Sequence, residues 1–149
     1  MKLKIDINNV AKSPAKKVFV KKVILMTLEK SGHMELAEKS LGLSLAWVDE
    51  VEMQKINKLY CKKNKATDVL SFCEYKDASE LKKAVGRELF LGELVLCYNY
   101  IQESVAGCVS ETDSQKELAR VIAHGVLHLL GFSHGKKMFV IQDMIANNF

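Results

Sequence analysis

The sequence lacks the long apolar runs that mark membrane proteins. It contains no stretch of about 18 uncharged apolar residues, which argues against a membrane-spanning helix. The first ten residues, MKLKIDINNV, alternate apolar and polar side chains instead of forming a charged head and an apolar block, so they do not resemble a secretory signal. We therefore expect a cytoplasmic protein without a membrane partner.

Cysteine pairs are also missing. The four cysteines, Cys61, Cys73, Cys97 and Cys108, form no CxxC pair, which argues against a zinc ribbon and against a disulfide scaffold. Reduced and partly buried thiols are expected instead. Repeats, low-complexity tracts and long linkers are absent too, so residues 1–149 are expected to form a single domain.

The composition is that of a chain with one sizeable core. Of the 149 residues, 48% are hydrophobic, and the formal net charge is +4. Lysines are concentrated in KSPAKKVFVKK, KINKLYCKKNK and LKKAVGR. This balance suits an anionic partner such as RNA, although lysine runs are usually only solvated faces.

Strand and helix patterns alternate in the first half of the chain. Alternating side chains predict a strand over Leu3–Asn8. Ser13 followed by Pro14 predicts the start of a helix that Gly32 ends, with Val18 on its apolar face. The next predicted elements are a strand over Leu43–Asp49, a helix over Glu50–Lys63 capped by Asp49, and a strand over Thr67–Tyr75.

The second half begins with a charged stretch, Lys76–Glu88, that is expected to be an exposed excursion. The apolar segment LFLGELVLCYNY then predicts a strand covered on both faces. Three helices follow, over 98–106, over 113–130 with Ser110 or Thr112 as its cap, and over 136–148. Together these patterns predict an α/β fold of the α+β type, with a small, mixed, mostly parallel sheet packed with helices.

Three of the four histidines fall within HGVLHLLGFSH, residues 124–134. His124 and His128 are four residues apart on a predicted helix, so their imidazoles share one face. Gly131 can adopt the left-handed conformation that turns the chain back and lets His134 approach the same point. Three imidazoles leave one tetrahedral position open, as in catalytic zinc sites, where bound water ionises near neutral pH.

This spacing predicts one zinc ion per chain, held by His124, His128 and His134 on the long helix of the C-terminal half. Imidazole also suits nickel, copper and iron, and zinc is preferred for its geometry and ligand type. The alternative is that the histidines only pack inside an apolar helix. His33, which follows EKSG in a polar turn, is expected to be a surface histidine.

Gly125 stands where zinc proteases of this helix type carry the glutamate that transfers the proton. Peptide hydrolysis is therefore disfavoured, whereas phosphodiester cleavage, which has a better leaving group, stays open. Arg120 lies one helical turn before His124 and is predicted to contact a phosphate near the metal, so these two residues are the predicted catalytic residues. Glu117, a further turn back, is a candidate to orient Arg120 or a ligand histidine. The alternatives are that Arg120 is only a surface cation and that the two residues form a weak i, i+3 pair.

Thr67 and Asp68 are polar residues at the start of an otherwise apolar predicted strand. They are further candidates for the site. The alternative is that they form a pair that closes a turn.

HGVLHLLGFSH, together with KATDVLSF (Lys65–Phe72) and LGELVL (Leu91–Leu96), resembles the YbeY family of bacterial rRNA maturation factors and single-strand-specific endoribonucleases. The resemblance implies a mixed α/β fold with zinc on His124, His128 and His134. It also implies activity on single-stranded RNA in rRNA 3′-end maturation and ribosome quality control. Contacts with the small ribosomal subunit and with assembly proteins are implied as well.

The sequence departs from the family pattern at a few positions. Cys61 stands where the family usually carries an arginine for substrate phosphate, so Lys62 or Lys63 is a candidate to supply this charge. Ser133 replaces the usual aspartate before the third histidine, and Ala66 replaces a proline. The Cys61 departure favours the alternative function, a non-catalytic RNA-binding ribosome-assembly factor with a structural zinc. A metalloprotease is the weakest interpretation, because position 125 is glycine.

Overall fold

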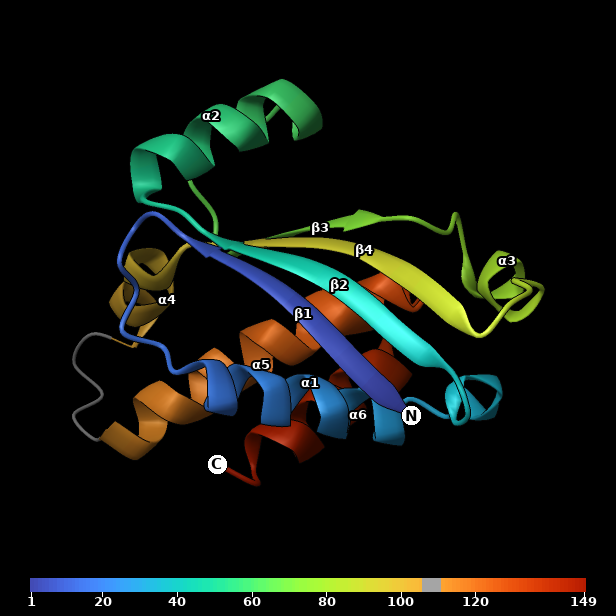
Figure 1. The fold of residues 1–149 in the computed structure, drawn as a ribbon. Helices are drawn as coiled ribbons and strands as arrows, with labels where there is room; N and C mark the ends of the chain where they lie inside the picture. The colour runs from blue at the N-terminus through green and yellow to red at the C-terminus, as the bar shows by residue number, and fades with distance from the viewer. Residues whose placement is uncertain (106–110) are drawn as a thin grey trace.

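The computed structural model describes residues 1–105 and 111–149 (Figure 1). Its strands are β1 (Lys2–Asn9), β2 (Ser40–Trp47), β3 (Val69–Cys73) and β4 (Glu88–Leu96). Its helices are α1 (Lys17–Lys30), the 3-10 turn η1 (Met34–Leu36), α2 (Glu50–Cys61), α3 (Ala78–Lys82), α4 (Tyr98–Ser104), α5 (Glu111–Leu129) and α6 (Lys136–Ala146). In this part of the chain, no helix is long and apolar enough to cross a bilayer.

The four described strands form the mixed, mostly parallel sheet that the sequence predicts. Their order is β1-β2-β4-β3, with β1 parallel to β2, β2 parallel to β4, and β3 antiparallel to β4. Helices α1, α5 and α6 lie on one side of this sheet, and α2 lies on the other side (Figure 1). Strand β3 is therefore an edge strand beside α5, the helix that carries two of the predicted metal ligands.

Strand β2 illustrates why the sheet has one covered face and one open face. Its leucines and tryptophan alternate with small or polar residues, and the apolar set is buried against the helices: Leu41, Leu43, Leu45 and Trp47. The intervening residues, Ser40, Gly42, Ser44 and Ala46, are only partly buried. The two-residue period thus places the core between the sheet and the layer of α1 and α5.

Strand β4 corrects the prediction of a strand covered along its whole length. Glu88, Phe90 and Glu93 are exposed, and burial on both faces is limited to Leu94–Leu96. A register irregularity opposite β2 accompanies Gly92, which has a φ of 136° and where a Cβ would lie 2.2 Å from the Phe72 carbonyl oxygen on β3. Only beyond this point does α2 cover the second face, through Met53 packed on Val95.

The start of α1 also differs from the prediction. The helix begins at Lys17 with Lys16 as its N-cap, so the prediction that Ser13 caps it is wrong. The Ser13 N–H instead bonds with Oδ1 of Asn9 at 2.8 Å, which holds a turn before the helix. Val18 is 80% exposed, because the buried stripe follows Val20, Val23, Ile24, Thr27 and Leu28.

The predicted cap of α2 is confirmed, since Asp49 Oδ1 accepts a hydrogen bond from the Glu52 N–H at 2.8 Å. The cap of α5 is not Thr112, because this residue lies within the helix. The other candidate cap, Ser110, lies outside the described residues. The charged excursion 76–88 contains the short helix α3, whose Leu81 is buried in the core.

Helix α5 lies unusually close to the sheet at Gly125. A Cβ atom at this position would be 2.9 Å from Leu94 Cδ2 and 3.1 Å from Val69 Cγ2. The hydroxyl of Ser71 on β3 donates to the Gly125 carbonyl oxygen at 3.0 Å. Position 125 therefore faces the sheet, and a larger side chain here would require Leu94 and Val69 to move.

We predict that Gly125→Glu lowers the free energy of unfolding by about 3 kcal/mol or more, because the carboxylate would be buried between α5 and the sheet without a partner. Urea denaturation of the purified variant measures this change. Gly135→Glu, which adds the same charge at an exposed position, is the matched control and is expected to unfold like the unmodified protein. A Gly125→Glu protein of unchanged stability would contradict the packing explanation.

Candidate metal centre

The three histidines predicted as ligands converge on one point. The Nε2 atoms of His124 and His128 are 3.1 Å apart, those of His128 and His134 are 3.1 Å apart, and those of His134 and His124 are 3.2 Å apart. His124 and His128 are half-buried on α5, and His134 is exposed in the loop that follows. The arrangement forms a nearly equilateral triangle of nitrogen atoms at the surface.

The residues present fit a single metal ion. Zn–N bonds of about 2.0–2.1 Å at tetrahedral angles place ligand nitrogens about 3.3–3.4 Å apart, close to the separations observed here. Three neutral imidazoles supply three positions and leave a fourth open. Because imidazole also binds copper, nickel and iron, the geometry supports a metal ion without selecting zinc.

Hydrogen bonds at the opposite ring nitrogen orient two of the imidazoles. His124 Nδ1–H donates to Oε1 of Gln142 on α6 at 2.9 Å. His128 Nδ1–H donates to the Phe132 carbonyl oxygen at 3.0 Å. Since each bond requires the proton on Nδ1, it leaves Nε2 as the free donor atom for a metal.

The turn after α5 supplies one of these acceptors and positions the third ligand. Gly131 has a φ of 89°. The Gly131 N–H donates to the His128 carbonyl oxygen, and the Phe132 N–H donates to the Leu127 carbonyl oxygen, both at 3.0 Å. This pair of bonds ends the helix in a Schellman motif. A Cβ at 131 would lie 2.3 Å from the Ala78 backbone nitrogen, so glycine is also required sterically.

The local environment keeps His128 in the state that a metal requires. Burial lowers the pKa of His128, and the neighbouring His124 imidazole lowers it further. The neutral ring is therefore favoured at physiological pH, and a metal binds the neutral ring. Partial desolvation by neighbouring atoms raises the pKa of the Cys73 thiol, which donates to the His128 carbonyl oxygen at 3.3 Å.

The triad borders a cleft of about 620 Å³, here called the metal cleft. Edge strand β3 lines it on one side. The segment between α2 and β3 adds three charged residues, Lys63, Lys65 and Asp68. Lys76, Thr67 and Cys61 also line it.

Of the two lysines predicted to replace the family arginine, Lys63 lies at the metal cleft. Lys62 is not among the lining residues; it ends α2 in the left-handed conformation.

The candidates Thr67 and Asp68 border the metal cleft and also make the local pair that was their alternative explanation. Asp68 Oδ1 accepts the Val69 N–H at 2.7 Å and lies 3.4 Å from the Thr67 hydroxyl. The Asp68 carbonyl oxygen accepts the Cys97 N–H at 3.0 Å, which starts the β3–β4 ladder. These contacts position the start of the strand beside the triad.

Arg120 lies one turn before His124, as predicted, but two carboxylates hold its guanidinium. Its Nη1 is 2.6 Å from Glu117 Oε2, and its Nε is 3.1 Å from Asp143 Oδ1 on α6. Burial would lower the pKa of Arg120, but the bonds with Asp143 and Glu117 outweigh burial and raise it. Arg120 is not among the residues that line the metal cleft.

His33 corrects the prediction of a surface histidine, because it is only 8% exposed. Its Nδ1 is 2.6 Å from Glu35 Oε1, and its ring contacts the edge of Phe132 at a centroid distance of 6.0 Å. Burial raises the pKa of Glu35, but the bond with His33 and other favourable contacts bring it below its usual value. Gly32 and Met34 on either side are exposed, whereas the His33 ring is buried where it packs against Phe132 in the turn that ends α5.

Sequence reasoning missed Gln142, the Phe132 carbonyl and Cys73 as neighbours of the ligands. A half-buried glutamine on a helix and a backbone carbonyl carry no distinctive pattern in a single sequence. Of the cysteines predicted to be partly buried thiols, Cys61 and Cys73 are exposed and Cys97 is buried, all three being free. Cys108 lies outside the described residues.

The fold and the site together define a mixed α/β domain with a candidate three-histidine metal centre. The family model "Endoribonuclease YbeY" matches residues 6–149. The chain is 36% identical over 135 residues to Endoribonuclease YbeY of Staphylococcus saprophyticus, covering 84% of this chain and 82% of that protein. It is 34% identical over 128 residues to Endoribonuclease YbeY of Staphylococcus aureus strain JH9, covering 82% and 81%.

A solved structure is similar in fold. The solution structure of TM1509 from Thermotoga maritima matches with a TM-score of 0.56 at 23% identity, covering 97% of this chain and 87% of that one. The match of the family model, together with the two relatives, settles the assignment. This chain belongs to the YbeY endoribonuclease family.

We predict that Gln142→Leu weakens metal binding about 10- to 100-fold, because His124 would lose the acceptor that orients its ring. Competition with a chromogenic chelator measures the dissociation constant. Gln142→Glu, which keeps an acceptor oxygen, should retain tight binding, and Gln115→Leu on an exposed part of α5 controls for the change in residue type. Equal affinities for Gln142→Leu and Gln115→Leu would show that the contact does not orient the ligand.

Proposed function

We propose that this protein is a zinc-dependent, single-strand-specific endoribonuclease of the cytoplasm that acts in rRNA 3′-end maturation and ribosome quality control. The observation that carries the proposal is the convergence of three Nε2 atoms, 3.1–3.2 Å apart, at a lysine-lined cleft. Family membership supports RNA as the substrate. The small ribosomal subunit and its assembly proteins are the proposed partners, with one zinc ion per chain as the cofactor.

The charges around the metal cleft favour an RNA backbone. Lys63, Lys65 and Lys76 line the cleft, and Asp68 is the one carboxylate among its described lining residues. Asp68 Oδ1 is already bonded to the Val69 N–H. A single strand can bend into such a cleft and turn its bases outward, whereas a stiff A-form duplex cannot, which supports the single-strand preference.

The histidines and the lysines of the metal cleft have different proposed roles. When bound, the metal ion would polarise a phosphoryl oxygen and orient the water nucleophile. His124, His128 and His134 would hold it, with His124 the ligand also assigned to catalysis, and the lysines would bind the phosphates on either side of the reacting bond. Gly125 supplies no base and faces the sheet, so no proton transfer is assigned to this position.

We predict that His124→Ala abolishes both stoichiometric metal binding and cleavage of single-stranded RNA, since two imidazoles remain and the orienting bond to Gln142 is lost. Elemental analysis measures the metal, and gel electrophoresis of end-labelled RNA measures cleavage. The same sequence annealed into a duplex serves as the control substrate. Undiminished cleavage by metal-free protein would contradict a catalytic role for the ion.

The alternative function is an RNA-binding ribosome-assembly factor with a structural metal. Cys61, which lines the metal cleft at the place of the usual family arginine, is the observation that favours it. The two functions separate when RNA binding and RNA cleavage are measured in one preparation, before and after chelation and zinc re-addition. Binding without turnover in the zinc-restored protein would select the assembly factor.

The proposed catalytic role of Arg120 has two forms. In the first, the guanidinium contacts a substrate phosphate. In the second, favoured by its bonds to Glu117 and Asp143, it ties α5 to α6 and thereby supports Gln142 behind His124.

These forms make different predictions for Arg120→Ala. We expect a supporting residue to weaken metal affinity and to leave the KM for RNA unchanged once zinc is saturating. A phosphate contact would instead raise KM and leave metal affinity intact. Chelator competition and steady-state cleavage at saturating zinc distinguish the outcomes, and the second outcome would overturn the supporting role.

A further inference from the structure

Beyond the triad, one further depression adjoins the metal cleft, and a third depression adjoins that one in turn. Gly131 and Phe132 line the metal cleft and also a second depression of about 220 Å³. Ser31 and Gly32, on the far side of this second depression, also line a third one of about 570 Å³. Each hollow shares lining residues with the next, so the three lie one after another along the surface, and their series is here called the path.

The path beyond the triad is lined by lysines that come from three separate segments. Lys82 on α3 and Lys137 on α6 border the second depression, and Lys30 at the end of α1 and Lys136 on α6 border the third. All four side chains are exposed. No acidic residue is among the described residues that line these two depressions. Glu35, bonded to His33, is a nearby carboxylate that Lys82 acts on, and the four cations still leave a net positive field that favours a polyanion.

Gly131 and Phe132 form the boundary between the metal cleft and the second depression. The Phe132 ring lies there, with the Lys137 Nζ 5.6 Å from its centroid and the buried His33 ring against its edge. Gly131 lets the backbone of the turn pass close to Ala78, since a side chain at this position would collide with the Ala78 backbone. A strand that leaves the triad thus passes a partly buried aromatic ring and an ammonium group, a combination that suits single-stranded nucleic acid.

We propose that the lysine path Lys82–Lys137–Lys30–Lys136 is an extended subsite for the RNA strand on one side of the cleaved bond. This inference rests on the proposed function and adds a second binding region to it. Short RNA would occupy only the metal cleft. Longer RNA would also place phosphates along the outer path, so affinity should grow with strand length until the path is filled.

The test measures binding of 5′-labelled oligouridylates, from tetramer to dodecamer, by fluorescence anisotropy with chelator present so that no turnover occurs. In the unmodified protein, affinity is expected to rise with length and then level off. In Lys30→Ala/Lys82→Ala, the rise should be lost, and the slope of log K against log salt for the dodecamer should fall by about 0.7 for each lost contact. Neither substitution touches the loop that carries His134.

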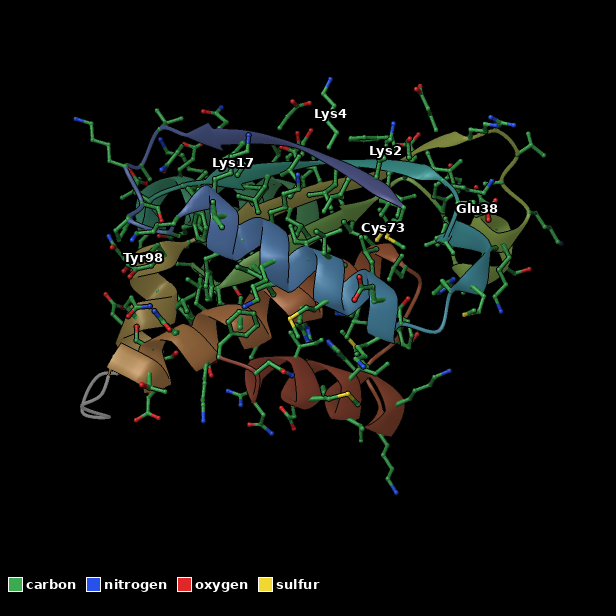
Figure 2. All side chains as sticks on the ribbon, turned by 60° about the horizontal axis from the view of Figure 1, so that its bottom comes forward. Lys2, Lys4, Lys17, Glu38, Cys73 and Tyr98 are labelled. Atoms are coloured by element: carbon green, nitrogen blue, oxygen red, sulfur yellow. The ribbon has the colours of Figure 1, made fainter. Side chains whose placement is uncertain are left out.

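The matched control is Lys2→Ala/Lys4→Ala, which removes the same charge from β1, across the molecule from α6 (Figure 2). It should keep the rise in affinity with length, and thermal unfolding should show that both double variants stay folded. A rise that persists in Lys30→Ala/Lys82→Ala, or one lost equally in the control, would overturn the subsite. Cleavage of the tetramer by zinc-loaded unmodified protein tests the proposed function separately, because that substrate does not reach the outer path.

Discussion

The structure depends on the close approach of α5 to the edge of the sheet at Gly125. A larger side chain at position 125 would meet Leu94 and Val69 on the sheet, whereas His124 and His128 lie on another face of the helix, toward the metal cleft. Hydrogen bonds from Ser71 and Cys73 to carbonyl oxygens of α5 hold the edge strand against the helix. Strand β3 consequently lines one side of the metal cleft, so the shape of the site depends on how α5 packs against the sheet.

The candidate metal centre is oriented by groups outside the ligand motif itself. Gln142 reaches His124 from the following helix, and the Phe132 carbonyl reaches His128 from the turn that Gly131 makes possible. These bonds fix ring orientation before any ion binds, which lowers the entropic cost of assembling the site. The same turn carries His134 and borders the lysine path, so ligand geometry and the course of the proposed RNA strand depend on one structural element.

Local patterns explain which expectations were confirmed. The Asp49 cap and the shared face of His124 and His128 depend on contacts within one helical turn, so sequence spacing was sufficient for both. Expectations failed where distant packing decided the outcome. His33 lies in a polar turn, yet the turn after α5 covers it, and Val18 is apolar, yet the buried stripe of α1 passes beside it.

By itself, the sequence determined the three candidate ligands, their spacing, the absence of a glutamate at position 125 and the α/β alternation. These properties depend on residue identity and on the fixed periods of helix and strand. Only the tertiary structure decided that Gly125 packs against the sheet, that Gln142 bonds to His124, and that lysines from α1, α3 and α6 border two adjoining depressions. Such contacts join residues far apart in the chain, and they form only when the whole core packs.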